Sequence, residues 1–390
     1  MMKRLIAMAL MIVMAVTAAG CGGGSAPGGD PTVPDAPQPA PESVTPVLDR
    51  EGNRLGELDS RASCTAVDGG IFYSIVDLQE YRLTGHAEYR FFDRESKQDV
   101  RLGALENQGY EAAFARTEYD GKLYTLAVEG DPVEDASVPL VLLAADPAAG
   151  AMKKHTVSEN GFPYASMAVS NGKLLIMSHE MSEPKADRIY EFDPTAETMK
   201  EVLSFSPDTD SLRGVCPAED GFFLLRLKIN EGGENELFLD RYDHSYAKIS
   251  EQSVNEALIR AVMEIRGITG RQDALNELGM NVSRFAVADD RYLIYENFGL
   301  SRLIVDLGSG EALLREDDIY AVSSGAGAPY FYRMDFDPEE VEEPDITGLV
   351  DGEPVKLDFQ PADPCRLIRA VSHSAGGTWL VLTSDGFSAG

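Results

Sequence analysis

The sequence has few of the residues, and none of the short motifs, that mark common catalytic sites. Its 390 residues include four cysteines, five histidines and one tryptophan. No two cysteines form a CxxC pair and no histidines stand at metal-ligand spacing, which excludes the usual zinc modules and dithiol redox motifs. A GxSxG motif and a glycine-rich phosphate loop are also absent, which excludes the serine hydrolases and nucleotide-binding enzymes that carry them. We therefore expect no cofactor and no metal, and assign no catalytic residue.

Positive charge is also scarce. Lys and Arg number 34 against 65 Asp and Glu, which gives a formal net charge of −31 at pH 7. Such a surface repels phosphate groups, so nucleic acid is excluded as a partner. The densest acidic run, residues 335–345, lacks the spacing of a calcium-binding loop, and we interpret it as a solvated loop.

The N-terminus has the pattern of an export signal. Residues 1–4 are basic, and residues 5–17 form an apolar run that is too short for a spanning helix. The following residues, Ala18, Ala19, Gly20 and Cys21, resemble a bacterial lipobox, with Ala18 where that family most often has Leu. The resemblance implies that residues 1–20 are a lipoprotein signal peptide, removed before lipid is attached to Cys21. The alternative is an ordinary secretory signal followed by a chance cysteine.

The segment after Cys21 is rich in Gly, Pro, Ser and Ala and has no apolar period. We interpret residues 21–45 as the lipidated cysteine and a disordered linker, and residues 46–390 as one folded domain. The lipid anchor places this domain in the cell envelope, on the extracytoplasmic side of a membrane. We expect it to be a monomer.

The folded part is organised around a repeat, seen most clearly at residues 164–205. There, apolar runs at 165–170 and 173–178 flank Asn171-Gly172, a strong hairpin signal. Runs at 188–192 and 198–205 flank a turn that begins at Asp193-Pro194. The four runs predict a four-stranded antiparallel sheet.

Two marks of this repeat alternate along the whole chain, at a usual spacing near 50 residues. The first is an Asp-Gly-like turn before an apolar run, and the second is an apolar run that ends in Asp and a turn. The first occurs near residues 68, 120, 171, 220, 289, 327 and 376, and the second at 49, 93, 146, 193, 243, 306 and 351. This period predicts an all-β, seven-bladed β-propeller of four-stranded blades.

The first and last marks of the repeat predict how the ring of blades closes. The strands expected at 46–50 and 54–58 form the outer half of a blade, and those at 366–372 and 378–383 form its inner half. Residues 119–124 (YDGKLY) and 168–174 (AVSNGKL) resemble the inner-strand turn of WD-repeat and YVTN-type propellers. The resemblance implies the propeller architecture and no particular activity.

A helical insertion at residues 253–280 interrupts the series of repeat marks. Apolar residues fall there at helical spacing, Ser253 and Glu256 predict a capping box, and a second helix is expected at 271–278. We expect the helices either to pack their apolar stripe on the side of the ring or to form a lid or partner-binding arm.

Five residues are candidates for a ligand site. Counting seven residues back from the seven first marks reaches early positions on the predicted inner strands. These positions are Arg61, Ala113, Tyr164, Arg213, Val282, Tyr320 and Arg369, and the three arginines and two tyrosines are the candidates. At one level of the channel mouth they would form a cationic, aromatic funnel, because guanidinium groups suit carboxylates and tyrosine faces suit sugar rings. The alternative is that each arginine pairs with a nearby acid and fills the channel.

Two further cysteines also leave an alternative open. Cys64 and Cys365 are expected at the starts of inner strands in neighbouring blades. They either form a disulfide or are small buried residues.

These observations favour a non-catalytic binding module for a glycan, peptide or envelope protein. The alternative is a glycan lyase or hydrolase with its site at the channel mouth. A third hypothesis is a structural assembly factor that binds through the blade sides or the helical insertion.

The lipid anchor is tested by replacing Cys21. Cys21→Ser should release the protein from membranes, because no other segment is long and apolar enough to hold it. Membrane pelleting of this variant beside Cys64→Ser measures the effect. Continued pelleting of Cys21→Ser would contradict the lipoprotein prediction.

Overall fold

The computed structural model describes residues 44–49, 54–59, 63–67, 69–78, 85–131, 138–161, 165–180, 184–229, 235–280, 282–288, 290–297, 300–316, 319–323, 330–333, 346–350, 353–357, 367–373 and 379–384, the last six ranges by their backbone. The predicted signal peptide, Cys21 and most of the predicted linker lie outside these ranges. Within them, no helix is long and apolar enough to cross a membrane.

In this part of the chain the strands form six antiparallel sheets. One combines both ends of the chain in the order β2-β1-β27-β26, from β1 (Val44–Leu48), β2 (Arg54–Asp59), β26 (Leu367–His373) and β27 (Trp379–Ser384). Four more are up-and-down sheets of four strands each. The first of these sheets contains β10 (Ser166–Ser170), β11 (Lys173–Glu180), β12 (Ala186–Asp193) and β13 (Thr198–Phe205), and the second contains β14 (Asp210–Ala218), β15 (Gly221–Ile229), β16 (Asn235–Asp243) and β17 (Lys248–Ser253). The third contains β18 (Val282–Ala288), β19 (Tyr292–Asn297), β20 (Leu300–Asp306) and β21 (Glu311–Glu316). The fourth contains β22 (Ile319–Ser323), β23 (Tyr330–Arg333), β24 (Ile346–Val350) and β25 (Glu353–Leu357).

The sixth sheet has seven strands and differs from the prediction of separate blades. It runs from β3 (Ser63–Val67) through β4 (Gly70–Leu78), β5 (Gly85–Asp93), β6 (Asp99–Tyr119), β7 (Lys122–Glu129) and β8 (Val138–Asp146) to β9 (Ala151–Gly161). The 21-residue β6 pairs with β5 through its first half and with β7 through its second half. Two predicted blades are therefore joined, because the chain continues extended from the outer strand of one to the first strand of the next.

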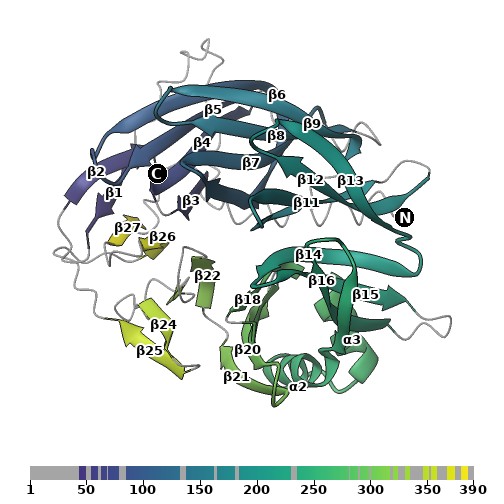
Figure 1. Ribbon diagram of the computed structural model, residues 1–390. Helices are drawn as coiled ribbons and strands as arrows, with labels where there is room; N and C mark the ends of the chain where they lie inside the picture. Colours follow the sequence, from purple (N-terminus) through teal and green to yellow (C-terminus); the bar gives the residue numbers. More distant parts are fainter. Residues whose placement is uncertain are drawn as a thin grey trace, which may run out of the picture.

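The sheets follow one another around the molecule in sequence order, and β26 and β27 lie beside β1 (Figure 1). Val47 and Leu48 of β1 pair with Leu382 and Val381 of β27, as the sequence predicts for the two chain ends. The all-β class and the curled four-stranded antiparallel sheets expected of a propeller are confirmed.

The two turn marks have direct structural causes. Asp120-Gly121 and Asn171-Gly172 have positive φ at both residues, which these residue types tolerate between two strands. In the second kind of turn an Asp side chain accepts hydrogen bonds from backbone N–H groups two to four residues ahead, at Asp93, Asp146, Asp193, Asp243 and Asp306. The aspartate therefore shapes the turn, which explains its recurrence.

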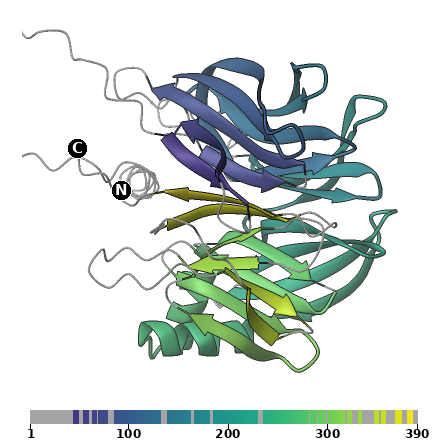
Figure 2. The ribbon, with the colours of Figure 1, turned by 90° about the vertical axis from the view of Figure 1, so that its left-hand side faces the viewer.

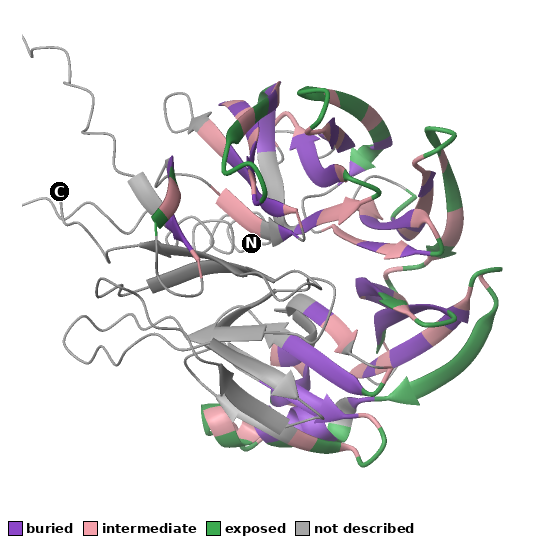
Figure 3. Ribbon diagram, turned by 60° about the vertical axis from the view of Figure 1, so that its left-hand side comes forward, coloured by how far each residue is buried: buried purple, intermediate pink, exposed green. Residues whose placement is uncertain are grey.

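The apolar core lies between successive sheets. The middle strands β11 and β15 are buried along consecutive residues, and so on both faces, whereas the outer strand β17 is exposed throughout. Figure 3 shows this gradient from buried to exposed strands. One cluster joins Leu175 and Ile189 of one sheet to Leu212 and Phe222 of the next. Each sheet thus covers a face of its neighbour.

The insertion forms two helices, α2 (Asn255–Arg266) and α3 (Arg271–Met280), at one edge of the molecule (Figure 2). Its apolar stripe is buried in the same cluster as residues of β16, β19 and β20, which agrees with the predicted packing on the blades. The predicted capping box is wrong. Val254 is the N-cap residue and makes no side-chain capping bond, because Ser253 belongs to β17 and pairs with Phe238.

Cys64 is a half-buried free cysteine. A disulfide from Cys64 is therefore not observed, and Cys365 lies outside the described residues. Cys216, also free, is fully enclosed, and burial raises the pKa of its thiol.

The pairing of the chain ends generates a stability prediction. Deleting residues 46–58 should lower the melting temperature of the whole domain, because it removes Val47 and Leu58 from the core and leaves one edge of β27 unpaired. Thermal unfolding followed by circular dichroism measures the effect, with deletion of linker residues 30–42 as the control. Equal melting temperatures for the deletion variant and the parent would contradict the structural role of β1 and β2.

Candidate functional site

The five predicted ligand-binding residues are described to different extents. Arg61 and Tyr164 lie outside the described residues, as does the predicted lipidation site Cys21. Tyr320 lies in β22, where it pairs with Tyr332, and Arg369 lies in β26; only their backbone is described. Arg213 lies in β14 and is described with its side chain. Among the five, the side-chain surroundings of Arg213 alone lie within the described residues, and the predicted funnel stays a prediction.

Arg213 and Arg369 both stand at irregularities of the strand register. Five pairs of the β14–β15 ladder, from Ala218 to Gly214, lie between the hairpin and Arg213, which itself has no partner across the ladder. Four pairs separate Arg369 from its hairpin, and Arg369 is likewise skipped. Each arginine is thus the extra residue of a β-bulge, a device that re-aims a side chain and is frequent beside binding sites.

A buried carboxylate fixes the bulge at Arg213. Asp187 of β12, 2% exposed, accepts a hydrogen bond from the Leu212 backbone N–H at 2.7 Å and from the Ser211 hydroxyl at 3.0 Å, both through Oδ2. Its Oδ1 lies 2.7 Å from Nδ1 of His179, which donates because a carboxylate only accepts. One side chain of the preceding sheet therefore holds the strand on which Arg213 stands.

Asp187 is ionised in this arrangement. Burial alone would raise the pKa of its carboxyl group, but the hydrogen bonds from His179, Leu212 and Ser211 outweigh burial and hold that pKa below its ordinary value. Both oxygens accept hydrogen bonds within the protein, Oδ1 from His179 and Oδ2 from Ser211 and Leu212.

The Arg213 side chain carries an unused donor. Its Nε is buried without a hydrogen-bond partner, and no ion pair joins Arg213 to another residue in the described part of the chain. Burial lowers the pKa of Arg213, and the charge of Asp187 opposes this. A guanidinium group stays protonated even so, so the site presents a positive charge with an unsatisfied N–H.

Gly214 completes the local geometry. A Cβ at this position would lie 2.3 Å from the ring of Phe285 in β18, so only glycine lets β14 approach the next sheet so closely. The bulge at Arg213 is therefore held on one side by Asp187 and on the other by this close contact.

Sequence reasoning missed Asp187, His179 and Ser211. His179 and Asp187 are directly opposite across β11 and β12, but Ser211 belongs to the next sheet. The repeat predicts that His179 lies opposite Asp187 only if the hairpin register is known. It does not predict the contact between Asp187 and Ser211.

Comparisons with known proteins give only weak similarity. No protein-family model and no curated protein matches the chain. The β-propeller domain of the Trilobed protease from Pyrococcus furiosus aligns over 79% of this chain and 87% of its own, with a TM-score of 0.46 and 12% identity. For Pyrococcus horikoshii acylaminoacyl peptidase the shares are 78% and 46%, with a TM-score of 0.44 and 9% identity.

A variant of the Synechocystis apocarotenoid oxygenase aligns over 55% of this chain, with a TM-score of 0.35 and 14% identity. The chain spans 51–56% of the length of the oxygenase structures that it matches. At these TM-scores the similarities assign no activity, ligand or partner.

The role of Asp187 is tested by Asp187→Asn. The variant should lose about 1.5–3 kcal/mol of unfolding free energy, because the hydrogen bonds lose their charged acceptor. Urea unfolding at pH 7 measures the loss, and the exposed Asp208→Asn is the control.

The stability of the parent and that of Asp187→Asn should also depend differently on pH. Because the pKa of Asp187 is lower in the folded state, its contribution is present above about pH 4 and is lost as the pH falls through the folded pKa. The stability difference between the parent and Asp187→Asn should shrink over that range. A constant difference would contradict the assignment.

Proposed function

We propose that this chain is a seven-bladed β-propeller, closed by its N-terminal strands and anchored outside a membrane through lipid on Cys21. Its proposed function is non-catalytic binding of an anionic ligand, a carboxylate-bearing glycan or an acidic segment of a peptide or envelope protein. The observation that carries the proposal is the buried, unpartnered Nε of Arg213 on a bulge.

Contacts between the first strands of successive sheets support the ring. β3 contacts the second half of the seven-stranded sheet through β6, β6 contacts β10, β10 contacts β14, and β14 contacts β18. At the other end, β22 contacts β26, and β26 contacts β3. With β6 counted as the first strand of its second unit, these strands provide seven blades. The pairing of β1 with β27 supports closure by the N-terminal strands.

The charge of Arg213 supports an anionic ligand. In a chain with a formal charge of −31, a guanidinium group without an internal acid partner among the described residues attracts a carboxylate, which it binds with two parallel hydrogen bonds. Arg369 occupies the corresponding bulge one ladder pair nearer its hairpin. Both arginines thus stand at the same kind of irregularity, four or five ladder pairs from the hairpin of their own sheet.

The engagement of Asp187 supports binding rather than catalysis. A glycan lyase or hydrolase needs a group with a free lone pair or proton at the substrate. Asp187, the buried carboxylate beside Arg213, spends both oxygens on His179, Ser211 and Leu212. Its hydrogen bonds assign it to positioning the strand that carries Arg213.

The proposal is tested with the double variant Arg213→Gln/Arg369→Gln. The mature protein is first screened on arrays of acidic glycans and acidic peptides, and the best probe is then titrated by calorimetry. The double variant should bind at least tenfold more weakly, since each charge-assisted hydrogen bond contributes about 1.5–3 kcal/mol. Binding should also weaken with added salt.

The control for this test is Arg260→Gln, on the exposed face of α2. It removes the same charge from an exposed position outside the bulges and should leave affinity unchanged. An equal loss in the control and the double variant would contradict a site at the bulges. Turnover of the bound glycan would instead favour the lyase or hydrolase alternative.

A further inference from the structure

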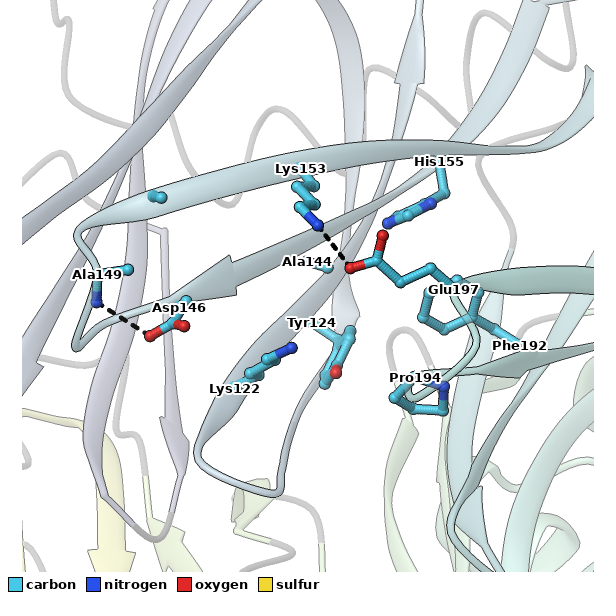
Figure 4. Close-up of a pocket in the computed structure, with 11 residues that line it drawn as sticks. Lys122, Tyr124, Ala144, Asp146, Ala149, Lys153, His155, Phe192, Pro194 and Glu197 are labelled. Atoms are coloured by element: carbon cyan, nitrogen blue, oxygen red, sulfur yellow. Dashed lines mark hydrogen bonds and ion pairs between the residues drawn. The ribbon is translucent and has the colours of Figure 1, made fainter.

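A pocket of about 190 Å³ lies between the β6–β9 strands and the β10–β13 sheet (Figure 4). Its lining residues lie at and near the hairpin turns at Asp120-Gly121, Asp146 and Asp193. This is the opposite end of the strands from Arg213, which stands five ladder pairs from its hairpin. The pocket is therefore separate from the candidate site described above.

The floor of the pocket is aromatic. Tyr124 and Phe192, both 1% exposed, meet edge to face with ring centroids 6.4 Å apart. The imidazole of His155 lies 4.8 Å from the Phe192 ring. Three rings from two adjacent sheets thus form the apolar base of the pocket.

Polar groups with unused capacity face this floor. Nε2 of His155 is buried without a hydrogen-bond partner, and burial lowers the pKa of the ring, which favours its neutral form. Lys122 forms no ion pair with another residue in the described ranges. Lys153 and Glu197, by contrast, form a 2.6 Å ion pair that bridges the two sheets. Asp146 also lines the pocket, where its Oδ1 accepts a hydrogen bond from the Ala149 N–H, and the charge of Lys122 acts on Glu197 without forming an ion pair. The ammonium group of Lys122 and one imidazole nitrogen are therefore the groups that an anionic ligand can engage.

The next gap along the chain shows that the fold does not require such a pocket. Between the β10–β13 and β14–β17 sheets the equivalent space is about 20 Å³. Tyr246 fills it, packing 6.1 Å from Phe222 and bonding to Glu191. Lys173 stands where Lys122 stands in its own hairpin, but it is neutralised by an ion pair with Asp193. In the larger pocket no side chain of the described residues takes the place of Tyr246, and Lys122 has no ion pair like that of Lys173 with Asp193.

We propose that the pocket between the β6–β9 and β10–β13 strands binds a small aromatic carboxylate. The ring packs on Tyr124, Phe192 and His155, the carboxylate pairs with the ammonium group of Lys122, and Nε2–H of His155 donates a hydrogen bond. The size agrees, because a cavity of about 150 Å³ holds a benzene ring, which leaves room for one carboxylate. The source is either a free small molecule or the carboxyl-terminal aromatic residue of a peptide.

The test uses the mature protein in detergent, titrated by calorimetry with four probes against blank micelles. The probes are 3-phenylpropanoate, N-acetylphenylalanine, N-acetylphenylalanine amide and benzylamine. The two carboxylates should bind and the amide and amine should not. Stronger binding of 3-phenylpropanoate would indicate a free small molecule, whereas stronger binding of N-acetylphenylalanine would indicate a peptide terminus.

Variants locate the site. Lys122→Met should weaken binding at least tenfold, and His155→Phe, which keeps the ring but removes the nitrogen, should weaken it several-fold. Lys173→Met is the matched control, since it changes the same hairpin position in the next repeat, and affinity should stay as in the parent. Circular dichroism melts show that each variant is folded.

A second measurement does not depend on these variants. In protein labelled with ¹⁵N-histidine, the carboxylate should shift the Nε2 resonance of His155 and leave that of His179 unchanged. No binding at about 10 mM probe, preference for benzylamine, or equal losses in Lys122→Met and Lys173→Met would each overturn the proposal.

Discussion

A four-stranded antiparallel sheet has two faces, and here neither face of a single sheet can be covered by that sheet alone. The structure follows from this constraint. The middle strands β11 and β15 carry consecutive buried residues, so both faces of each need a neighbour. The clusters that bury them combine residues of adjacent sheets, as with Ile189 and Phe222. Stability is therefore shared between neighbours, and α2 and α3 take part because they cover apolar surface on β16 and β20.

Apolar packing has no direction, so polar contacts set how one sheet meets the next. Arg116 of β6, 7% exposed, donates to the carbonyl oxygens of Ser63 at 2.7 Å and Phe72 at 3.1 Å, which fixes β6 against β3 and β4. Asp187 fixes β12 against β14 in the same way. These groups are almost completely buried, and a lost partner would leave a charge unsatisfied. The same contacts that fix the stagger of the sheets therefore also fix the bulge at Arg213.

How much the sequence predicted follows from the range of each interaction. Hairpins are local, so Asn171-Gly172 and the aspartate turns placed the strands of the 164–205 unit to within a few residues. The long β6 was not predicted, because whether a chain bends between two blades depends on how they pack. The capping box at Ser253 failed for a related reason, since pairing of Ser253 with Phe238 outweighed a helical propensity. Counting along the repeat makes Arg213 a candidate, but Asp187, which holds the neighbouring residues Ser211 and Leu212, comes from another sheet.

A repeat also makes its exceptions informative. Lys122 and Lys173 occupy the same place in two successive hairpins, and the backbone around them has the same positive φ pair. The scaffold is thus constant, and the difference lies in side chains alone. Asp193 neutralises one lysine and Tyr246 fills one space, whereas the other space stays open and its lysine forms no ion pair with a described residue. Because neighbouring sheets provide the stability at both places, single side chains at these turns are free to change without endangering the fold. Binding sites on such a scaffold are therefore best sought where one repeat departs from the next.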